Sequence, residues 1–459
     1  MTSLARLLCR GICALLTAVV LAVPATADTA RPDALRITLD EARQAAANAL
    51  MAGRAEDALI LSQGVLLGAP EDKTALFIKA RALRQLGNRD AAVETARMAW
   101  QTSETPRDRF YSAMMMAQMR SFAGQNGVAQ LWLRRAVQLA PDDRLKEIAV
   151  EDFRHVRRIT PWRFAMDLSL QPSDNLNNAP TEDTPVPGGV IKVTPPLSGL
   201  RYGAGVQMRY IKPLAPRVRL QFSGFAHGSA VRLSDEAKNV PGADAGDYSS
   251  AVLGGSVTLE GMAQDGGRLG RAQLSLRRQW QGGDPIADIA RLDLGLDQRL
   301  SPTVGLGLRL GFEDVKRLDS PVGDAQRRDA GLSLTKRFAH GALTLDMGVG
   351  ETFSAAYNVG RQDGSVGLSY AFAQPVAGVL PTLSFDYGVY NYDAPWIGAP
   401  NGPARQDRQR RIGVDLLLPE FDYYGFAPEV GVSFTDRKSN YNLYETRSTD
   451  MRFGLKSVF

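Results

Sequence analysis

The chain has 459 residues, of which 44% are hydrophobic and 22% are charged, and its formal net charge is +5. A balance this mild argues against a nucleic-acid-binding protein, which would carry a pronounced basic excess. The length allows more than one domain, and the composition changes along the chain in a way that separates two.

Residues 1–27 read as a secretory signal peptide. Arg6 and Arg10 precede an apolar run from Gly11 to Val23, and Ala25-Thr26-Ala27 supplies a small-x-small cleavage pattern. No later segment approaches the ~20 consecutive apolar residues that a membrane-spanning helix requires. If the mature chain meets a membrane, we therefore expect it to do so as a β-barrel.

The mature chain is predicted to have no disulfide and no cofactor. Cys9 and Cys13 both lie in the leader, and only His155, His227 and His340 remain as strong metal ligands. Zinc clusters and cysteine–histidine nucleophiles are thereby excluded or nearly so, and we expect no enzyme. One pattern points toward an enzyme: in His227-Gly228-Ser229 the histidine and serine share a strand face, as in outer-membrane phospholipases. The Asn-Gly that follows the pair in those enzymes is absent, which favours an ordinary histidine near a strand end.

Residues 28–158 are predicted to form a helical repeat domain. The region is rich in Ala, Leu, Arg, Glu and Gln at helical spacing, and Gly53 with Ala58 recurs 34 residues later as Gly87 with Ala92. This period is typical of tetratricopeptide repeats, and a less regular third unit follows. Such stacked helix pairs present a concave face suited to a peptide or partner. The basic segment from Arg154 to Thr160 is interpreted as a solvated linker, although it could also face headgroups or phosphates.

Residues 159–459 are predicted to form the barrel, because hydrophobic residues alternate with small or charged ones over long segments. Two examples are Val304 to Phe312 and Met451 to Phe459. Side chains alternate between the two faces of a strand, so such segments suit lipid outside and water inside. The lumen-facing set mixes both signs of charge, with Arg309, Arg411, Arg452, Asp415 and Asp450.

Alternation and turn signals together place fourteen strands, near 162–171, 200–211, 215–229, 247–261, 267–281, 286–300, 302–316, 326–338, 340–355, 363–374, 379–393, 405–419, 423–436 and 446–459. Short turns then alternate with longer loops, as expected for periplasmic turns and outside loops of an outer-membrane barrel. Boundary shifts of two to four residues would also accommodate twelve or sixteen strands.

Several short motifs recur in an order that resembles a known family. The long loop after the first strand carries Asp174, Asn175, Asn177 and Asn178, whose plain interpretation is turn formation. Further along lie Arg278 with Trp280, then Gly425, Phe426 and Pro428, and the terminal aromatic residue Phe459. Together with the leader, the repeats and fourteen strands, these resemble the surface lipoprotein assembly modulators of Gram-negative bacteria.

The resemblance implies a function in helping lipoproteins reach the outer leaflet. The expected fold is an N-terminal tetratricopeptide-like domain in the periplasm followed by a 14-stranded antiparallel outer-membrane β-barrel. The implied partners are a surface lipoprotein client, outer-membrane lipids with lipopolysaccharide, and the barrel assembly machinery during biogenesis, with no nucleic acid. The alternative is an exopolysaccharide export pore, since such secretins also join repeats to a barrel. Those generally have more repeats and an acidic lumen.

Overall fold

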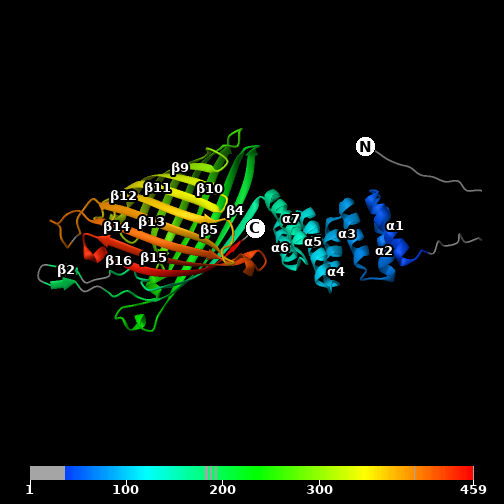
Figure 1. Ribbon diagram of the computed structural model, residues 1–459, viewed down its shortest axis with the longest axis horizontal. Coiled ribbons are helices and arrows are strands. Elements are labelled where there is room, and N and C mark those ends of the chain that lie inside the picture. The colour runs from blue at the N-terminus through cyan, green and yellow to red at the C-terminus, as the bar shows by residue number, and fades with distance from the viewer. Residues whose placement is uncertain (1–36, 181–183, 187–188, 192–193, 397, 458–459) are drawn as a thin grey trace, which may run out of the picture.

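The computed structural model describes residues 37–180, 184–186, 189–191, 194–396 and 398–457. They form a helical domain and a β-barrel, with the helices lying beyond one end of the barrel (Figure 1). We call this end of the barrel proximal and the opposite end distal. The predicted signal peptide and Phe459 lie outside the described residues.

The helical domain has seven helices: α1 (Leu39–Met51), α2 (Ala55–Gly68), α3 (Lys73–Gln85), α4 (Arg89–Gln101), α5 (Pro106–Phe122), α6 (Asn126–Leu139) and α7 (Asp143–Ile159). Gly53, Gly87 and Gly124 have φ of +75°, +80° and +79° and separate the helices of three successive pairs. Glycine adopts this conformation without steric cost, which explains the recurrence of glycine in the sequence. The three predicted helix pairs are therefore confirmed, and α7 follows them.

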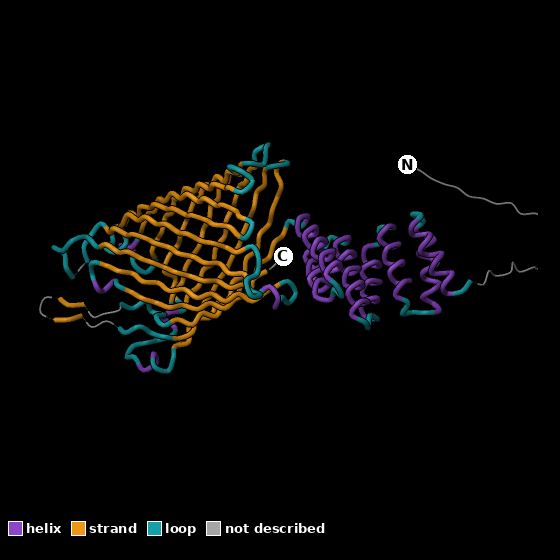
Figure 2. Tube along the Cα trace, viewed as in Figure 1, coloured by secondary structure: helices purple, strands orange, loops and turns teal. Residues whose placement is uncertain are grey.

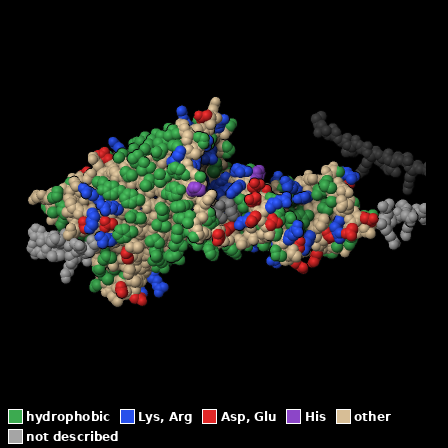
Figure 3. All heavy atoms as spheres, in the orientation of Figure 1, with side chains coloured by type: hydrophobic (Ala, Val, Ile, Leu, Met, Phe, Trp, Pro, Cys, Tyr) green, Lys and Arg blue, Asp and Glu red, His purple; other side chains and the backbone are tan. Residues whose placement is uncertain are grey.

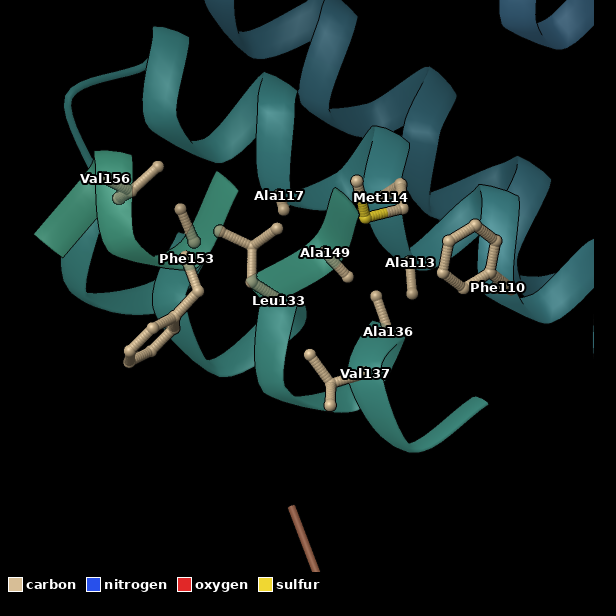
Figure 4. Packing of buried hydrophobic residues seen from close by; sticks show 11 residues of the cluster. Phe110, Ala113, Met114, Ala117, Leu133, Ala136, Val137, Ala149, Phe153 and Val156 are labelled. Atoms are coloured by element: carbon tan, nitrogen blue, oxygen red, sulfur yellow. The ribbon is translucent and has the colours of Figure 1, made fainter. Parts of the chain in front are cut away.

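The last helices pack on a shared core, in which Phe110 and Leu133 are almost completely buried (Figure 4). Phe153 and Val156 of α7 join this core. None of the helices in the described part of the chain is long and apolar enough to span a membrane.

The predicted linker is wrong, because residues 154–159 are the last turns of α7. Burial of Val156 fixes this segment against the core, and the Thr160 hydroxyl donates to the carbonyl of Val156 at 2.5 Å. Gln130 of α6 also donates to the Thr160 hydroxyl oxygen, at 3.2 Å. Only Thr160 and Pro161 separate α7 from the first strand, so the two domains are joined almost directly.

Fourteen antiparallel strands close the barrel, as predicted: β1 (Trp162–Ser173), β4 (Gly199–Ala215), β5 (Val218–Leu233), β6 (Ser250–Met262), β7 (Arg268–Gln281), β8 (Asp284–Arg299), β9 (Val304–Arg317), β10 (Ala325–Phe338), β11 (Gly341–Ser354), β12 (Arg361–Phe372), β13 (Leu380–Tyr392), β14 (Gln406–Leu417), β15 (Phe426–Ser439) and β16 (Thr446–Ser457). Each strand pairs with its neighbours in sequence, and β1 closes the ring against β16 (Figure 2). The short strands β2 (Thr184–Val186) and β3 (Gly189–Ile191) form a separate hairpin within the loop after β1.

The outer face of the barrel is apolar, and Figure 3 shows a broad hydrophobic band over the strands. Phe164, Leu308 and Phe453 are examples of large side chains that are exposed on this face. Alternate residues point inward, so the predicted division into an apolar outer face and a polar inner face is confirmed. A closed antiparallel barrel with this pattern is the fold of outer-membrane proteins.

The connections differ in length between the two ends of the barrel. The shortest proximal turns have two residues, as between Ala215 and Val218 or between Phe338 and Gly341, but residues 373–379 and 418–425 form longer proximal connections. The longest connections, 174–198 and 234–249, are distal as predicted, whereas 318–324 and 440–445 are no longer than those two proximal ones. Strands β7 and β8 are joined at the distal end by only Gly282 and Gly283, with φ of +60° and +94°.

Candidate functional site at the seam between the first and last strands

The contact between β1 and β16, which we call the seam, is less completely paired than the other side of β1. Strand β4 pairs with β1 throughout, from Trp162–Tyr210 to Ser173–Gly199. Strand β16 pairs with β1 at Ser169–Gly454, Leu170–Phe453 and Ser173–Asp450. Continuing this register would place Leu168 opposite Leu455, but among the described residues no pairing extends to the proximal part of β1. Among the described residues, the seam is therefore paired at Ser169, Leu170 and Ser173, whereas residues 166–168 have no described pairing with 455–457.

At the distal end, the residues after β1 bind the backbone of β16. Asp174 Oδ1 accepts a hydrogen bond from the backbone nitrogen of Thr449 at 2.8 Å. Asn175 is only 6% exposed, and its Nδ2 donates to the carbonyls of Ala179 and Arg447, both at 3.0 Å. These two predicted motif residues therefore close the seam where it faces the loops.

The same loop also contains Asn177 and Asn178, and no described contact joins either residue to β16. Asn177 Nδ2 donates to the carbonyl of Pro195 at 3.0 Å, and its Oδ1 accepts from the backbone nitrogen of Leu197 at 2.9 Å. Asn178 has φ of +51°, a conformation that asparagine tolerates better than most residues. The turn-forming interpretation thus describes these two, while Asp174 and Asn175 also join strands.

At the proximal end, the helical domain contacts the seam through Arg134 of α6. Its Nη1 donates to the carbonyl of Tyr424 at 2.8 Å, and its Nη2 donates to the hydroxyl of Ser457 at 3.0 Å. Ser457 is the last residue of β16. The guanidinium carbon also lies 4.8 Å from the ring centre of Phe153 and 4.4 Å from that of Phe426. One side chain therefore connects α7, the turn before β15 and the end of β16.

The turn that receives α6 has an unusual backbone. Tyr424 and Gly425 have φ of +52° and +75°, and Tyr423 and Phe426 form a bridge around them. Glycine suits this conformation, but for a bulky residue such as tyrosine it is a genuine outlier. Gln138 Oε1 accepts from the backbone nitrogen of Tyr424 at 3.0 Å. The helical domain therefore binds the strained residue Tyr424 through both its backbone N–H and its carbonyl oxygen.

Burial and the charge of Arg157 lower the pKa of Arg134 to about 10, while the charge of Asp422 acts in the opposite direction. Arg134 nevertheless stays protonated at neutral pH. Its hydrogen bonds to the Tyr424 carbonyl and the Ser457 hydroxyl are therefore charge-assisted, which makes them stronger than neutral ones.

An apolar groove of about 1150 Å³ lies on the outer face and extends from β16 across β1, β4, β5 and β6 to Trp280 of β7. Exposed side chains from the two strands of the seam border it, among them Leu168, Leu170, Phe453 and Leu455. Trp280 and Tyr202 also border it, and the small residues Ala204, Gly228, Ala230 and Ala251 leave it room. The groove therefore covers the pairs Ser169–Gly454 and Leu170–Phe453 and reaches Leu168 and Leu455, beyond which no pairing of the seam is described.

Opposite charges are paired across the inner wall from β7 to β12. Arg277 lies 2.9 Å from Glu313, Arg291 lies 2.9 Å from Asp329, and Arg327 lies 2.6 Å from Asp363. The last two pairs reach over Gly311 and Gly350 on the intervening strands. The predicted mixture of signs is confirmed, and Arg452 likewise contacts Asp415 at 2.7 Å.

The other predicted motif residues have separate positions. Arg278 on the outer face binds Asp288 of β8 with two hydrogen bonds of 2.6 Å, whereas Trp280 borders the groove. Gly425 and Phe426 belong to the turn that receives α6, and Pro428 stands opposite Leu455 of β16. Of the motif residues that the structure describes, Asp174 and Asn175 connect the two strands of the seam, whereas Gly425, Phe426 and Pro428 lie beside β16 in or before β15.

His227 and Ser229 point into the barrel and not toward lipid. The His227 imidazole lies 3.3 Å from Asp167, and the Ser229 hydroxyl lies 2.8 Å from that of Ser250. The two residues therefore contact different partners. In the described part of the chain, no group of three or more His, Cys, Asp or Glu residues could hold a metal ion.

The sequence analysis missed Arg134 and Gln138. Both lie on the helix that follows the third glycine turn, where charged and polar residues ordinarily face solvent. Their spacing of four residues puts both side chains on one face of α6. This shared face was the only feature of the sequence that could have indicated a common contact surface.

Fold and site define a membrane β-barrel of the outer-membrane type with a docked helical domain. No protein-family model and no curated protein matches the sequence. Among solved structures, the type III secretion translocator chaperone SycD of Yersinia enterocolitica is similar at 17% identity, with 27% of this chain and 88% of that chain covered and a TM-score of 0.24. OccAB3 of Acinetobacter baumannii is similar at 9% identity (63% and 98% covered, TM-score 0.35). A bacterial polysaccharide outer membrane secretin is similar at 10% identity (64% and 98% covered, TM-score 0.33). Scores this low carry no argument, so the fold assignment rests on the strand order itself.

Proposed function

We propose that this protein assists the translocation of lipoprotein clients across the outer membrane and their display on the cell surface. The helical domain lies in the periplasm and captures the client, and the barrel provides or assists the route. In this arrangement the proximal end of the barrel faces the periplasm and the distal loops face the outside.

The observation that carries the proposal is the position of the helical domain. Arg134 and Gln138 attach it beside the end of β16, where the described residues show no pairing with β1, and only two residues separate α7 from β1. A client bound to the repeats would be held close to the barrel at high effective concentration. Even weak capture would then raise the rate of transfer.

The chemistry of a lipoprotein fits a barrel with an open seam. Its acyl chains prefer the membrane by about 0.8 kcal/mol for each methylene, whereas its polypeptide prefers water. A closed lumen lined by ion pairs such as Arg291–Asp329 would suit the polypeptide alone. A seam that can part would let the acyl chains of a client stay in the membrane while its polypeptide stays in the aqueous lumen.

The paired charges of the inner wall favour this proposal over polysaccharide export. A conduit for one charged polymer is expected to present one sign of charge along its path. Here Arg277, Arg291 and Arg327 are each paired with a carboxylate. The described inner wall therefore offers no continuous acidic or basic track along these strands.

The test is surface display of a lipoprotein encoded beside the gene, with and without the full chain. Display is scored by protease shaving and antibody binding on whole cells, and total lipoprotein is measured by immunoblot. We expect display to depend on the chain while total lipoprotein does not change. Unchanged display together with reduced export of a polysaccharide would support the export pore instead.

Removal of residues 28–155 behind an intact leader tests the division of labour. We expect a barrel that is still heat-modifiable on gels but displays less lipoprotein, because the capture surface is gone. Heat-modifiability is the control for barrel folding, since a closed barrel resists detergent until it is heated. Normal display by such a folded barrel would assign capture to the barrel.

A further inference from the structure

We propose that the seam is a lateral exit, and that the apolar groove beside it takes the acyl chains of the client while its polypeptide passes outward. This inference rests on the proposed function and adds the class of ligand that the groove binds. Its occupant is the lipid anchor of a lipoprotein, and ordinary membrane lipid is the competing outcome.

The first reason is that β1 is the strand with a partly unpaired side. Leu168 and the residues before it pair with β4 throughout, but in the described part of β16 they have no register partner. Parting two strands costs their backbone hydrogen bonds, and here only the distal half of the strand contact has to part. The other thirteen pairs of neighbouring strands in the ring are hydrogen-bonded along most of their length. For example, β13 and β14 pair from Leu380–Leu417 to Asn391–Gln406.

The second reason is that the groove reaches the point where the described pairing of the seam stops on its proximal side. Leu168 and Leu455 border the groove and stand, in register, one step beyond the last described pair on that side, Ser169–Gly454. The groove lies on the hydrophobic outer face, and its volume of about 1150 Å³ is slightly above the range of about 300–1,000 Å³ for pockets that enclose a small molecule. An acyl chain moving sideways from the opening would enter this groove before it reached free lipid.

The third reason is that both ends of the seam are held by specific contacts. Asp174 and Asn175 bind β16 at the distal end, and Arg134 binds Ser457 at the proximal end. Because Arg134 belongs to the helical domain, a client that bends or displaces α6 would also release the end of β16. The contact thus couples capture on the repeats to the strand that has to move.

A disulfide across the seam tests the exit. Ser169 and Gly454 are register partners that face the lumen, and a Cβ on Gly454 would meet only ordinary contacts. The double variant Ser169→Cys/Gly454→Cys should therefore form a lock in the oxidising periplasm. The matched control is Ser384→Cys/Gly413→Cys, the same pair of residue types in register between β13 and β14. We expect the seam lock to reduce lipoprotein display to the level of cells without the chain, display to recover on reduction, and the control lock to have no effect.

Photo-crosslinking tests the occupant of the groove. A benzophenone amino acid replaces Leu168, and in the control it replaces Leu334, which is exposed on β10 on the other side of the ring. The probe is a client lipoprotein whose acyl chains carry an alkyne from metabolic labelling. We expect the labelled client to crosslink at position 168 and not at position 334.

The outcomes separate the two proposals. If the unmodified chain displays no lipoprotein, the proposed function fails and the exit fails with it. If the unmodified chain displays lipoprotein and the oxidised seam lock displays it equally well, the exit is wrong while the function stands. Crosslinks at position 168 to membrane lipid alone would show that the groove binds no client anchor.

Discussion

Arg134 Nη1 lies 2.8 Å from the carbonyl oxygen of Tyr424, although the two residues are 290 positions apart in the chain. This contact attaches the helical domain to a proximal turn of the barrel. It also places the domain at one particular strand end, because the second nitrogen of the same guanidinium binds Ser457.

Arg134→Ala is expected to loosen the helical domain from the barrel. It removes the two described charge-assisted hydrogen bonds to the barrel, each with a net value of about 1.5–3 kcal/mol. Hydrogen–deuterium exchange should accelerate in residues 418–426, whereas the exposed Arg144→Ala control should leave it unchanged. Equal exchange in the two variants would mean that other contacts hold the domain.

Tyr424→Asn is expected to stabilise the turn before β15 by about 1 kcal/mol, because asparagine tolerates positive φ better than tyrosine. The hydrogen bonds with Arg134 and Gln138 involve only the backbone of Tyr424 and remain possible. The matched control is Tyr423→Asn, at the exposed neighbour outside the positive-φ region. The heat needed to unfold the barrel on gels should rise for the first variant only. A fall for Tyr424→Asn would show that the aromatic contacts outweigh the strain.

Asn175→Ala is expected to weaken the distal end of the seam by about 1–3 kcal/mol, since it leaves the carbonyl of Arg447 without this buried donor. Asn177→Ala serves as the control, because its described hydrogen bonds stay within the loop. Both variants should make the loop more sensitive to protease on whole cells. Only Asn175→Ala should lower the temperature at which the barrel unfolds, and an equal shift in both would contradict the closure of the seam by Asn175.

Gly311→Ala is expected to reduce the amount of folded barrel by displacing the Arg291–Asp329 pair. A Cβ at this position would lie 2.6 Å from Asp329 Oδ2, and relieving such overpacking typically costs about 1–3 kcal/mol. Gly305→Ala lies on the same strand, and its Cβ would meet nothing within 4 Å. Heat-modifiable protein in outer-membrane fractions is the measurement. Equal amounts for the two variants would show that the ion pair can shift without loss.

Asp152→Asn is expected to stabilise the helical domain at neutral pH. Burial raises the pKa of Asp152 above its ordinary value, and the charge of His155 partly opposes this. A carboxyl with a raised folded pKa stabilises the fold while protonated, and this contribution is lost as the pH rises through that pKa. The gain at pH 7 should stay below about 1 kcal/mol, because the carboxyl keeps part of its hydration.

Thermal unfolding of the helical domain by circular dichroism checks this at pH 7 and at pH 3. The difference between Asp152→Asn and the parent should shrink at the lower pH, where Asp152 is protonated. A constant difference at both values would point to a cause other than ionisation.

The sequence by itself determined the elements and the number of strands. Alternation from Val304 to Phe312 assigns each side chain to a face because neighbouring residues of any strand point in opposite directions. Likewise, Gly53 and Gly87 mark helix ends because only glycine adopts positive φ freely. These properties are local, so they can be predicted without knowing which segments meet. The basic residues 154–159 misled the local interpretation, since burial of Val156 in a core built by other helices makes this segment helical.

The tertiary structure alone decided how β1 meets β16 and which residues hold them. The pairing of the first strand with the last depends on the total register shift around the whole ring. This total cannot be predicted from any local sequence pattern. Arg134 reaches Ser457 across 323 positions only because α6 docks where β16 ends. The ion pairs of the inner wall depend in the same way on which residues the register brings level, as for Arg291 and Asp329 across Gly311. Contacts between distant segments arise from geometry that no short stretch of sequence contains, which is why the site emerged only in the folded chain.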